Sequence, residues 1–119
     1  MRNSIIGALV VILLPAAAHA EGDVVAGEKA FVPCKACHAF GKNGVGPNLT
    51  GVVGRKSASE EGYNYSAAMK ASGITWDESN LHEWLKNPKA KVPGTKMIFA
   101  GYPDDKKIDD LIAYLATKK

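Results

Sequence analysis

The sequence predicts an all-α domain, and three observations support this fold class. Apolar residues recur at helical spacing in separate segments, most clearly at Leu81, Trp84 and Leu85. Ser, Thr and Asp residues stand before several of these segments, as helix N-caps do. No apolar run alternates convincingly with polar residues, as a half-buried strand would.

A first helix is predicted from Asp23, a suitable N-cap, towards Phe31. Val24, Gly27 and Phe31 then fall on one helical face, at positions i, i+3 and i+7. Pro33 is expected to end or bend this helix, because proline lacks a backbone N–H. The following segment, residues 41–54, holds five glycines and one proline and is predicted to be a loop.

Two helices are predicted in the middle of the chain. Ser66 is expected to cap a short helix that stops at Gly73. Thr75 and Glu78 have capping-box spacing, so Thr75 is predicted as the N-cap of a second helix that Asn87-Pro88 ends. His82 lies off the apolar stripe of that helix and is interpreted as a solvated residue rather than a ligand.

A loop from Pro88 to Pro103 and a last helix complete the prediction. This helix is expected to begin near Asp104-Asp105 and to end with Lys118-Lys119, charges that suit a helix dipole. Its predicted apolar face consists of Ile108, Leu111, Ile112 and Leu115, with Tyr114 beside it.

The first twenty residues have the features of a secretory signal peptide. Arg2 is followed by a short apolar run from Ile5 to Leu14, and Ala18-His19-Ala20 forms an A-x-A cleavage signal. An uncleaved N-terminal anchor is the alternative, but the run is short for a bilayer span. We expect cleavage after Ala20, a periplasmic protein, and one small domain over residues 21–119.

The pentapeptide Cys34-Lys35-Ala36-Cys37-His38 is the most informative motif. Two cysteines three residues apart, followed at once by histidine, are typical of a covalent haem c attachment site. One helical turn brings residues i and i+3 to the same face, where two thiols can meet the two vinyl groups of one haem. The adjacent His38 can then reach the iron.

Three other interpretations of the pentapeptide were weighed. A zinc site usually needs four ligands, but the chain has two cysteines, and His19 and His82 stand in no second cluster. A thioredoxin-like motif belongs beside a βαβ pattern, which is not evident here. A plain disulfide does not require the following histidine. Haem attachment is therefore the preferred interpretation.

The second axial ligand decides whether the iron is closed or open to substrate. The candidates are His82, Met69 and Met97. Met69 lies inside the predicted helix after Ser66, where methionine more often fills a core. Met97 lies in a predicted loop, which can deliver a thioether without breaking a helix. The spacing alone makes Met97 only moderately better than Met69.

The whole mature chain resembles the class I cytochromes c of the mitochondrial and bacterial c2 type. The resemblance is carried by motifs in the family's order: Gly27 and Phe31, the pentapeptide, Gly46-Pro47-Asn48-Leu49, Gly54-Arg55, Ile74-Thr75-Trp76, Asn87-Pro88, Pro93-Gly-Thr-Lys-Met97-Ile-Phe and Leu111-Ile-Ala-Tyr114-Leu115. It implies a small class I cytochrome c fold, with helices and loops wrapped around one covalently bound haem.

The resemblance also implies the roles of individual residues. Cys34 and Cys37 would carry the thioether bonds of one haem c, with His38 and Met97 as the axial ligands of the iron. Pro47 would accept a hydrogen bond from His38. Tyr65 and Trp76 would hydrogen-bond a haem propionate, and Arg55 would offset the charge of that propionate. Thr95 would help to anchor the haem or the ligand loop. Without the resemblance, the preferred interpretation is that Tyr65 and Trp76 are core aromatics and that Arg55 is a surface charge.

Three departures from the family pattern stand out. Trp84 replaces a common tyrosine beside the Met ligand, and Met69 replaces a common asparagine near buried water. Both changes remove polar groups near the iron. Pro33 directly precedes Cys34, with one residue fewer than the mitochondrial spacing from Phe31.

The resemblance implies an electron carrier rather than an enzyme, cycling between Fe(II) and Fe(III). An open-site haem protein, either peroxidase-like or gas-binding, is the alternative and requires an iron without Met97. We expect a monomer that meets redox proteins such as a bc1-type complex, an oxidase, a reaction centre or a dehydrogenase. The formal net charge is only +3 and no nucleic-acid-binding module is recognisable, which argues against nucleic-acid binding.

Lysines flank both predicted ligand segments. They are Lys29, Lys35 and Lys42 around the pentapeptide, and Lys86, Lys89, Lys91 and Lys96 before Met97. One interpretation is an ordinary mixed, solvated surface. The sharper hypothesis is a basic ring around the haem edge that steers an acidic partner surface towards it.

Overall fold

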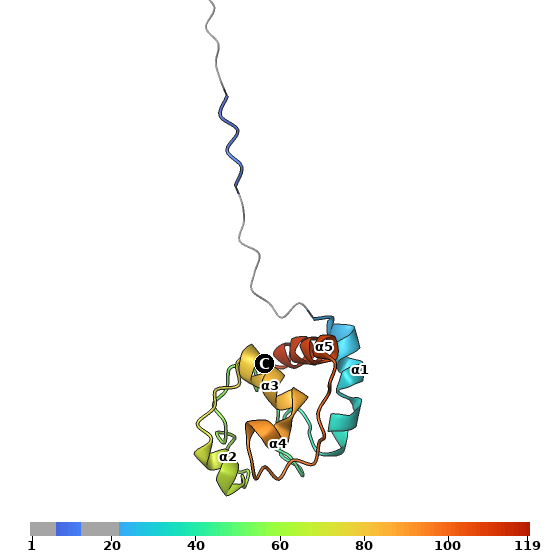
Figure 1. The fold of residues 1–119 in the computed structure, drawn as a ribbon, viewed down its shortest axis with the longest axis vertical. Helices are drawn as coiled ribbons and strands as arrows, with labels where there is room; N and C mark the ends of the chain where they lie inside the picture. The colour runs from blue at the N-terminus through green and yellow to red at the C-terminus, as the bar shows by residue number, and fades with distance from the viewer. Residues whose placement is uncertain (1–6, 13–21) are drawn as a thin grey trace, which may run out of the picture.

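The computed structural model describes residues 7–12 and 22–119 and confirms the all-α prediction. Its elements, in chain order, are α1 (Val24–Ala30), the 3-10 helix η1 (Val32–Ala36), α2 (Ala67–Ala71), α3 (Glu78–Lys86), α4 (Pro88–Lys91) and α5 (Asp105–Ala116). Figure 1 shows α1 and α5 side by side, with long loops linking the shorter helices. The described part of the chain holds no β-strand, only an isolated bridge between Lys56 and Thr75.

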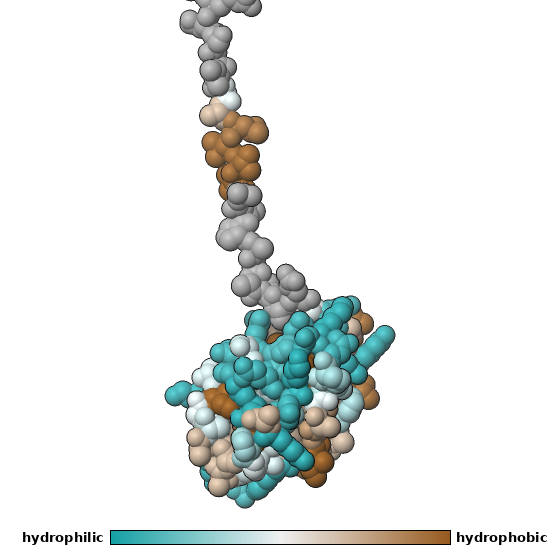
Figure 2. Space-filling view, viewed as in Figure 1, coloured by the Kyte–Doolittle hydropathy of each residue, from teal (hydrophilic) through white to brown (hydrophobic). Residues whose placement is uncertain are grey.

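The predicted signal peptide and its cleavage site after Ala20 fall largely on residues 1–6 and 13–21, which lie outside the described residues. Within residues 7–12, the apolar side chains of Leu9, Val10, Val11 and Ile12 are exposed (Figure 2). Among the described residues, no helix has the length and apolar character needed to span a membrane. The prediction of a cleaved signal peptide stays a prediction.

Helices α1 and α5 meet at a close crossing around Gly27 and Phe31. A Cβ atom on Gly27 would lie 1.9 Å from the backbone oxygen of Asp110, so only glycine fits there. The Phe31 and Tyr114 rings pack with centroids 5.5 Å apart. The buried Asp110 carboxylate accepts a 2.8 Å hydrogen bond from the backbone N–H of Asp23, the predicted N-cap of α1. The first and last helices are thus joined at both ends of the crossing.

The N-cap of α3 is Asp77, and the prediction of Thr75 was wrong. The Asp77 side chain accepts a 2.8 Å hydrogen bond from the Asn80 N–H. Thr75 pairs with Lys56 across the isolated bridge, and the N–H of Trp76 donates to the carbonyl of residue 55 over 2.8 Å. These backbone bonds hold the chain extended as far as Asp77, so the helix cannot begin earlier.

The predicted loop after Asn87 begins instead with the four-residue helix α4. Pro88 occupies its first position, where a missing N–H costs nothing. The Asn87 side chain, which follows the end of α3, accepts a 3.2 Å hydrogen bond from the Ala90 N–H. Asn87-Pro88 therefore ends one helix, as predicted, and starts another.

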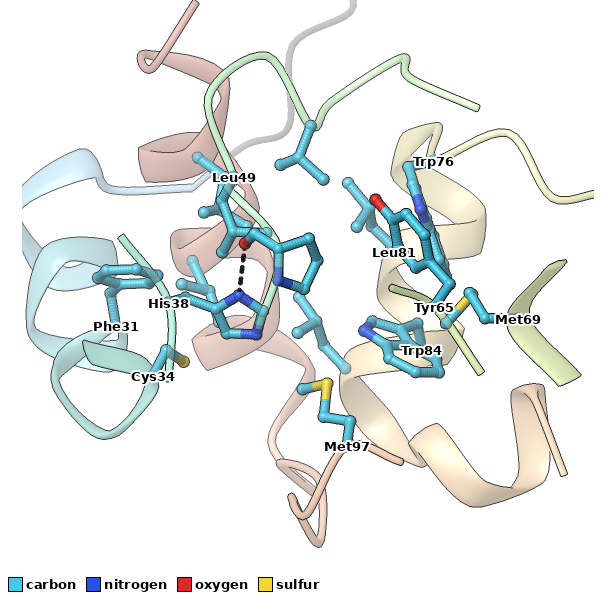
Figure 3. A pocket seen from close by; sticks show the side chains of 15 residues that line it. Phe31, Cys34, His38, Leu49, Tyr65, Met69, Trp76, Leu81, Trp84 and Met97 are labelled. Atoms are coloured by element: carbon cyan, nitrogen blue, oxygen red, sulfur yellow. Dashed lines mark hydrogen bonds between the residues drawn. The ribbon is translucent and has the colours of Figure 1, made fainter. Parts of the chain in front are cut away.

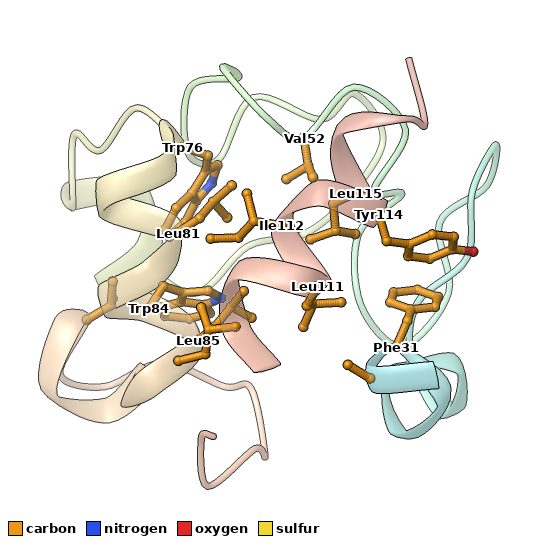
Figure 4. Packing of buried hydrophobic residues seen from close by; sticks show 13 residues of the cluster. Phe31, Val52, Trp76, Leu81, Trp84, Leu85, Leu111, Ile112, Tyr114 and Leu115 are labelled. Carbon is orange, nitrogen blue, oxygen red and sulfur yellow. The ribbon is translucent and has the colours of Figure 1, made fainter. Parts of the chain in front are cut away.

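The core is built on α5. This helix begins after the N-cap Asp104, as predicted, but it ends at Ala116, before Lys118-Lys119. Its four predicted apolar residues are all buried, and Figure 4 shows Leu111, Ile112 and Leu115 packed between α1 on one side and α3 on the other. The cluster continues through Val52, Trp76, Leu81, Trp84 and Leu85.

Ser66 caps the short helix α2 by accepting a 3.1 Å hydrogen bond from the Met69 N–H, as predicted.

Candidate haem-binding site

The pentapeptide lies at the end of η1. The backbone N–H groups of Cys37 and His38 donate to the carbonyl of Cys34 over 3.1 and 2.8 Å. A 3-10 helix has three residues per turn, so side chains at i and i+3 are aligned. Cys34 and Cys37 have this spacing and both are free thiols. This is the local geometry that two thioether bonds to one haem require.

The environment of the cysteines bears on two of the three other interpretations, the thioredoxin-like motif and the zinc site. Burial, with a smaller contribution from the neighbouring Cys37, raises the pKa of the Cys34 thiol. A reactive redox thiol needs the opposite shift, towards thiolate. The described residues also contain no group of three or more His, Cys, Asp and Glu side chains that could hold a metal ion. A zinc site is therefore not supported, and Cys34 is not an activated redox thiol.

His38 is held by Pro47. The distance between its Nδ1 and the Pro47 carbonyl oxygen is 3.0 Å, and the dashed line in Figure 3 marks this bond. A carbonyl only accepts, so Nδ1 carries the ring hydrogen and Nε2 keeps its lone pair. Burial lowers the pKa of His38, helped by Arg55 and opposed by the Pro47 hydrogen bond. The result is a neutral imidazole with an oriented Nε2, the form that binds iron.

Gly46 explains why this loop can approach the ring so closely. A Cβ atom at Gly46 would lie 2.4 Å from Cε1 and 2.7 Å from Nδ1 of His38. The backbone N–H of Gly46 also donates to the Cys37 carbonyl over 2.8 Å. A glycine at this position lets residues 46 and 47 lie flat against the imidazole.

His38 opens onto an apolar hollow in the centre of the molecule. An inner part of about 640 Å³ and an outer part of about 1080 Å³, which includes the mouth, share seven lining residues. These are Cys34, His38, Pro47, Tyr65, Met69, Trp84 and Met97. The inner wall is completed by core residues that include Phe31, Leu81 and Leu111. A large, flat, mostly apolar group is the kind of ligand that such walls fit.

Both candidate methionines line the hollow, and His82 does not. Met97 comes from the loop before α5, and its backbone N–H donates to Thr95 Oγ1 over 3.2 Å. Met69 comes from α2, with its sulfur 3.8 Å from the Ser72 hydroxyl. His82 Nε2 instead lies 3.5 and 3.7 Å from the carboxylates of Asp105 and Asp109.

The polar residues expected to face a haem propionate have different surroundings. Tyr65 and Trp76 both line the inner part of the hollow. The Tyr65 hydroxyl accepts a 3.1 Å hydrogen bond from the Glu60 N–H, and burial raises its pKa. Arg55 donates from Nη1 to the Thr50 carbonyl over 3.2 Å and to Glu60 over 3.0 Å.

Arg55 lines neither part of the hollow, but it supplies a polar group that a haem could use. Its Nε is buried and finds no hydrogen-bond partner in the protein. A buried donor without an acceptor is costly, so this N–H indicates a ligand with an acceptor oxygen. A haem propionate is such a ligand. The two aligned thiols, the oriented imidazole and this unsatisfied donor together match the groups of haem c.

Two departures from the family pattern, Trp84 and Met69, both line the hollow. Trp76 lines it too, and its ring packs against that of Trp84 with centroids 5.2 Å apart. This side of the site is apolar, as expected from the two replacements. The roles of Gly46 and Glu60 were not predicted, because both depend on contacts between separate loops.

Comparison with known proteins agrees with this site. A family model described as cytochrome c matches residues 24–119. Cytochrome c-554 of Methylosinus trichosporium is 59% identical over 100 residues, 82% of this chain and 76% of that protein. Cytochrome c2 of Rhodomicrobium vannielii is 54% identical over 106 residues, 87% of this chain and 85% of that protein.

A solved structure shows the same fold. Cytochrome cH from Methylobacterium extorquens has a TM-score of 0.80 and 63% identity, and the match covers 82% of this chain and 100% of that one. The chain belongs to the cytochrome c family: it is a haem-based electron carrier rather than an enzyme, it binds haem c covalently through Cys34 and Cys37, and it exchanges electrons with redox proteins.

Proposed function

We propose that this cytochrome is a diffusible periplasmic electron carrier whose iron is ligated by His38 and Met97. The observation that carries the proposal is the His38–Pro47 hydrogen bond at the hollow, which leaves Nε2 free and oriented. When bound, haem would supply a one-electron Fe(II)/Fe(III) couple, and ligation by methionine together with histidine would raise its reduction potential. With His38 and Met97 both bound to it, the iron would keep no site for a substrate.

Met97 is a better candidate than Met69 for the second ligand. Its segment is a loop held by the Thr95 hydroxyl, so its position does not depend on helix geometry. The Met69 sulfur lies within hydrogen-bonding distance of the Ser72 hydroxyl, and its backbone belongs to α2. Figure 3 shows Met69 beside Tyr65 and Met97 on a different part of the wall. These contacts favour a structural role for Met69.

The test of ligation is the absorption spectrum of the exported holoprotein. The ferric protein should have the long-wavelength charge-transfer band of a methionine–iron bond. Met97→Ala should remove this band and open the ferrous iron to carbon monoxide, whereas the matched variant Met69→Ala should keep the band. If Met69→Ala loses the band and Met97→Ala keeps it, Met69 is the ligand. A wild-type ferric form without the band would favour the open-site alternative.

Periplasmic location is proposed from the N-terminal sequence. The Arg2 charge, the apolar run and the Ala18-His19-Ala20 signal are those of a cleaved Sec-type leader. The mass of the mature protein tests it. Residues 21–119 plus one haem are expected, and a mass that includes residues 1–20 would indicate a retained N-terminal anchor.

The proposed docking face is the mouth of the hollow. Val45 and Ile98 line it with 76% and 100% of their surfaces exposed, and Lys96 lies beside them. Two of the flanking lysines have acidic partners within the chain: Lys86 pairs with Asp105 and Lys91 with Glu83. An apolar mouth among basic residues suits brief contact with an acidic partner. A bc1-type complex, an oxidase, a reaction centre or a dehydrogenase has the required redox chemistry.

A further inference from the structure

Glu60 lies at the centre of a hydrogen-bonded network beside the haem site. Its Oε2 is 3.0 Å from Arg55 Nη1, and its Oε1 accepts a 3.2 Å bond from Asn48 Nδ2. Its backbone N–H donates to the Tyr65 hydroxyl over 3.1 Å. Glu60 therefore contacts Arg55, Tyr65 and Asn48, the neighbour of Pro47, which come from three separate segments.

The Glu60–Arg55 pair is shielded from water. The side chains of Arg55 and Glu60 are only 15% and 22% exposed. A charge pair at such a depth is less screened than a surface pair, so it acts more strongly on a nearby centre. Glu60 also accepts from only one of the nitrogen atoms of Arg55. The buried Nε is left without a protein acceptor.

From these contacts we infer that Glu60 is a positioning residue that sets the reduction potential through Arg55. Glu60 holds Nη1 and so leaves the Nε–H of Arg55 for a haem propionate. Its negative charge also offsets the positive charge of Arg55. Reduction adds an electron, so a shielded carboxylate in this place disfavours the reduced state and lowers the potential. The inference rests on the proposed function, because it requires a haem in the hollow, and it adds that a propionate of this haem faces Arg55.

The chain offers a matched control in Glu61. Its side chain is exposed, and only its backbone carbonyl joins the network, as acceptor of a 3.0 Å bond from Asn43 Nδ2. Glu61→Gln removes the same charge one residue away and leaves the Arg55 contacts intact. The two variants therefore separate a shielded ion pair from a general change in net charge.

The experiment is a spectroscopic redox titration of the purified holoprotein and of both variants. Glu60→Gln should shift the potential upwards by a two- to tenfold change in the reduction equilibrium, about 20–60 mV at about 59 mV per tenfold. Glu61→Gln should shift it by less than a third of that. Equal shifts in both variants would overturn the inference, and so would an unchanged potential in Glu60→Gln.

Two further readouts keep the outcomes distinct. Urea unfolding of each variant shows whether the protein is destabilised, and a loss of stability without a shift in potential would assign Glu60 a structural role only. The charge-transfer band of the ferric protein reports methionine ligation independently of Glu60. Absence of that band in the wild type would defeat the proposed ligation, while the Glu60 comparison would still be decided by the two potentials.

Discussion

Gly46 lies so close to His38 that a methyl group on its Cα would come within 2.4 Å of the imidazole. The ring is thus confined between the backbone of residue 46 and the Pro47 carbonyl, which accepts its 3.0 Å hydrogen bond. The imidazole of His38 can therefore hold this position only because residue 46 has no side chain.

Gly46→Ala should displace His38 or the loop and destabilise the holoprotein by about 1–3 kcal/mol, the usual cost of overpacking. Urea unfolding monitored by haem absorbance measures this. Gly44→Ala is the control, because a Cβ there would lie an ordinary 3.5 Å from the Cys37 carbonyl. Equal stability losses in the two variants would show that the contact with His38 is not the cause.

The Asp110–Asp23 contact predicts a specific pH dependence. The Asp23 N–H, followed by the Lys106 ammonium, lowers the pKa of the Asp110 carboxyl. Its stabilisation is therefore complete above the unfolded-state value, about 3.9, and is lost as the pH falls through the lower folded value. Asp110→Asn should be less stable than wild type at pH 7, and the gap should narrow towards pH 3.

Unfolding free energies measured across this pH range test that prediction. The exposed Glu28 on α1 provides the control, since Glu28→Gln should follow the wild-type curve at every pH. A gap between Asp110→Asn and wild type that is constant with pH would mean that packing, and not charge, is what Asp110 contributes.

The Tyr102 hydroxyl joins the last loop to α1. It donates to the buried Ala30 carbonyl over 2.7 Å. Tyr102→Phe keeps the ring but leaves this carbonyl without its donor, so a loss of about 1–3 kcal/mol in unfolding free energy is expected. Tyr63 donates to the Val45 carbonyl, also over 2.7 Å, but in an exposed place.

Tyr63→Phe should cost less than Tyr102→Phe, because water can replace the lost donor at residue 45. Denaturant midpoints of the two variants, measured side by side, make the comparison. The reverse order would argue that the Tyr102 hydroxyl contributes little and that its ring contacts hold the loop.

The basic mouth predicts a salt-dependent rate of electron transfer. Between about 0.01 and 0.15 M salt the Debye length falls from about 30 to about 8 Å, so steering of an acidic partner weakens. Stopped-flow reduction of such a partner should slow as salt rises. Lys96→Glu at the mouth should lower the rate at low salt more than Lys56→Glu, which is exposed and lines no part of the hollow. A flat salt response would remove the steering hypothesis.

Most of the fold followed from local sequence signals. Asp23 caps the helix that it was predicted to cap, the last helix begins at Asp104-Asp105 as predicted, and the apolar face of α5 is buried as its period indicates. The prediction of Thr75 as an N-cap was wrong because capping-box spacing is a local signal, whereas the bridge to Lys56 is a contact between distant residues. No local sequence pattern predicts a single bridge between two loops.

The site could be predicted in the same uneven way. The spacing of the pentapeptide implies its chemistry, and the resemblance to class I cytochromes c implies the His38–Pro47 hydrogen bond, which is present. Glu60 could not be found by this route. It lies in a loop without periodicity, and its importance comes from Arg55 and Asn48, which loop closure brings to it.

The bond between Asp23 and Asp110 joins residues 87 positions apart, close to the whole length of the domain. Closing a flexible chain of this length costs about 4 kcal/mol before any contact offsets it. The thioether bonds at Cys34 and Cys37 leave this loop open, because both cysteines lie near α1, and ligation of the iron by both His38 and Met97 would shorten it. A chain truncated before α5 lacks both the Asp110 carboxylate that binds the Asp23 N–H and the helix on which the core is built.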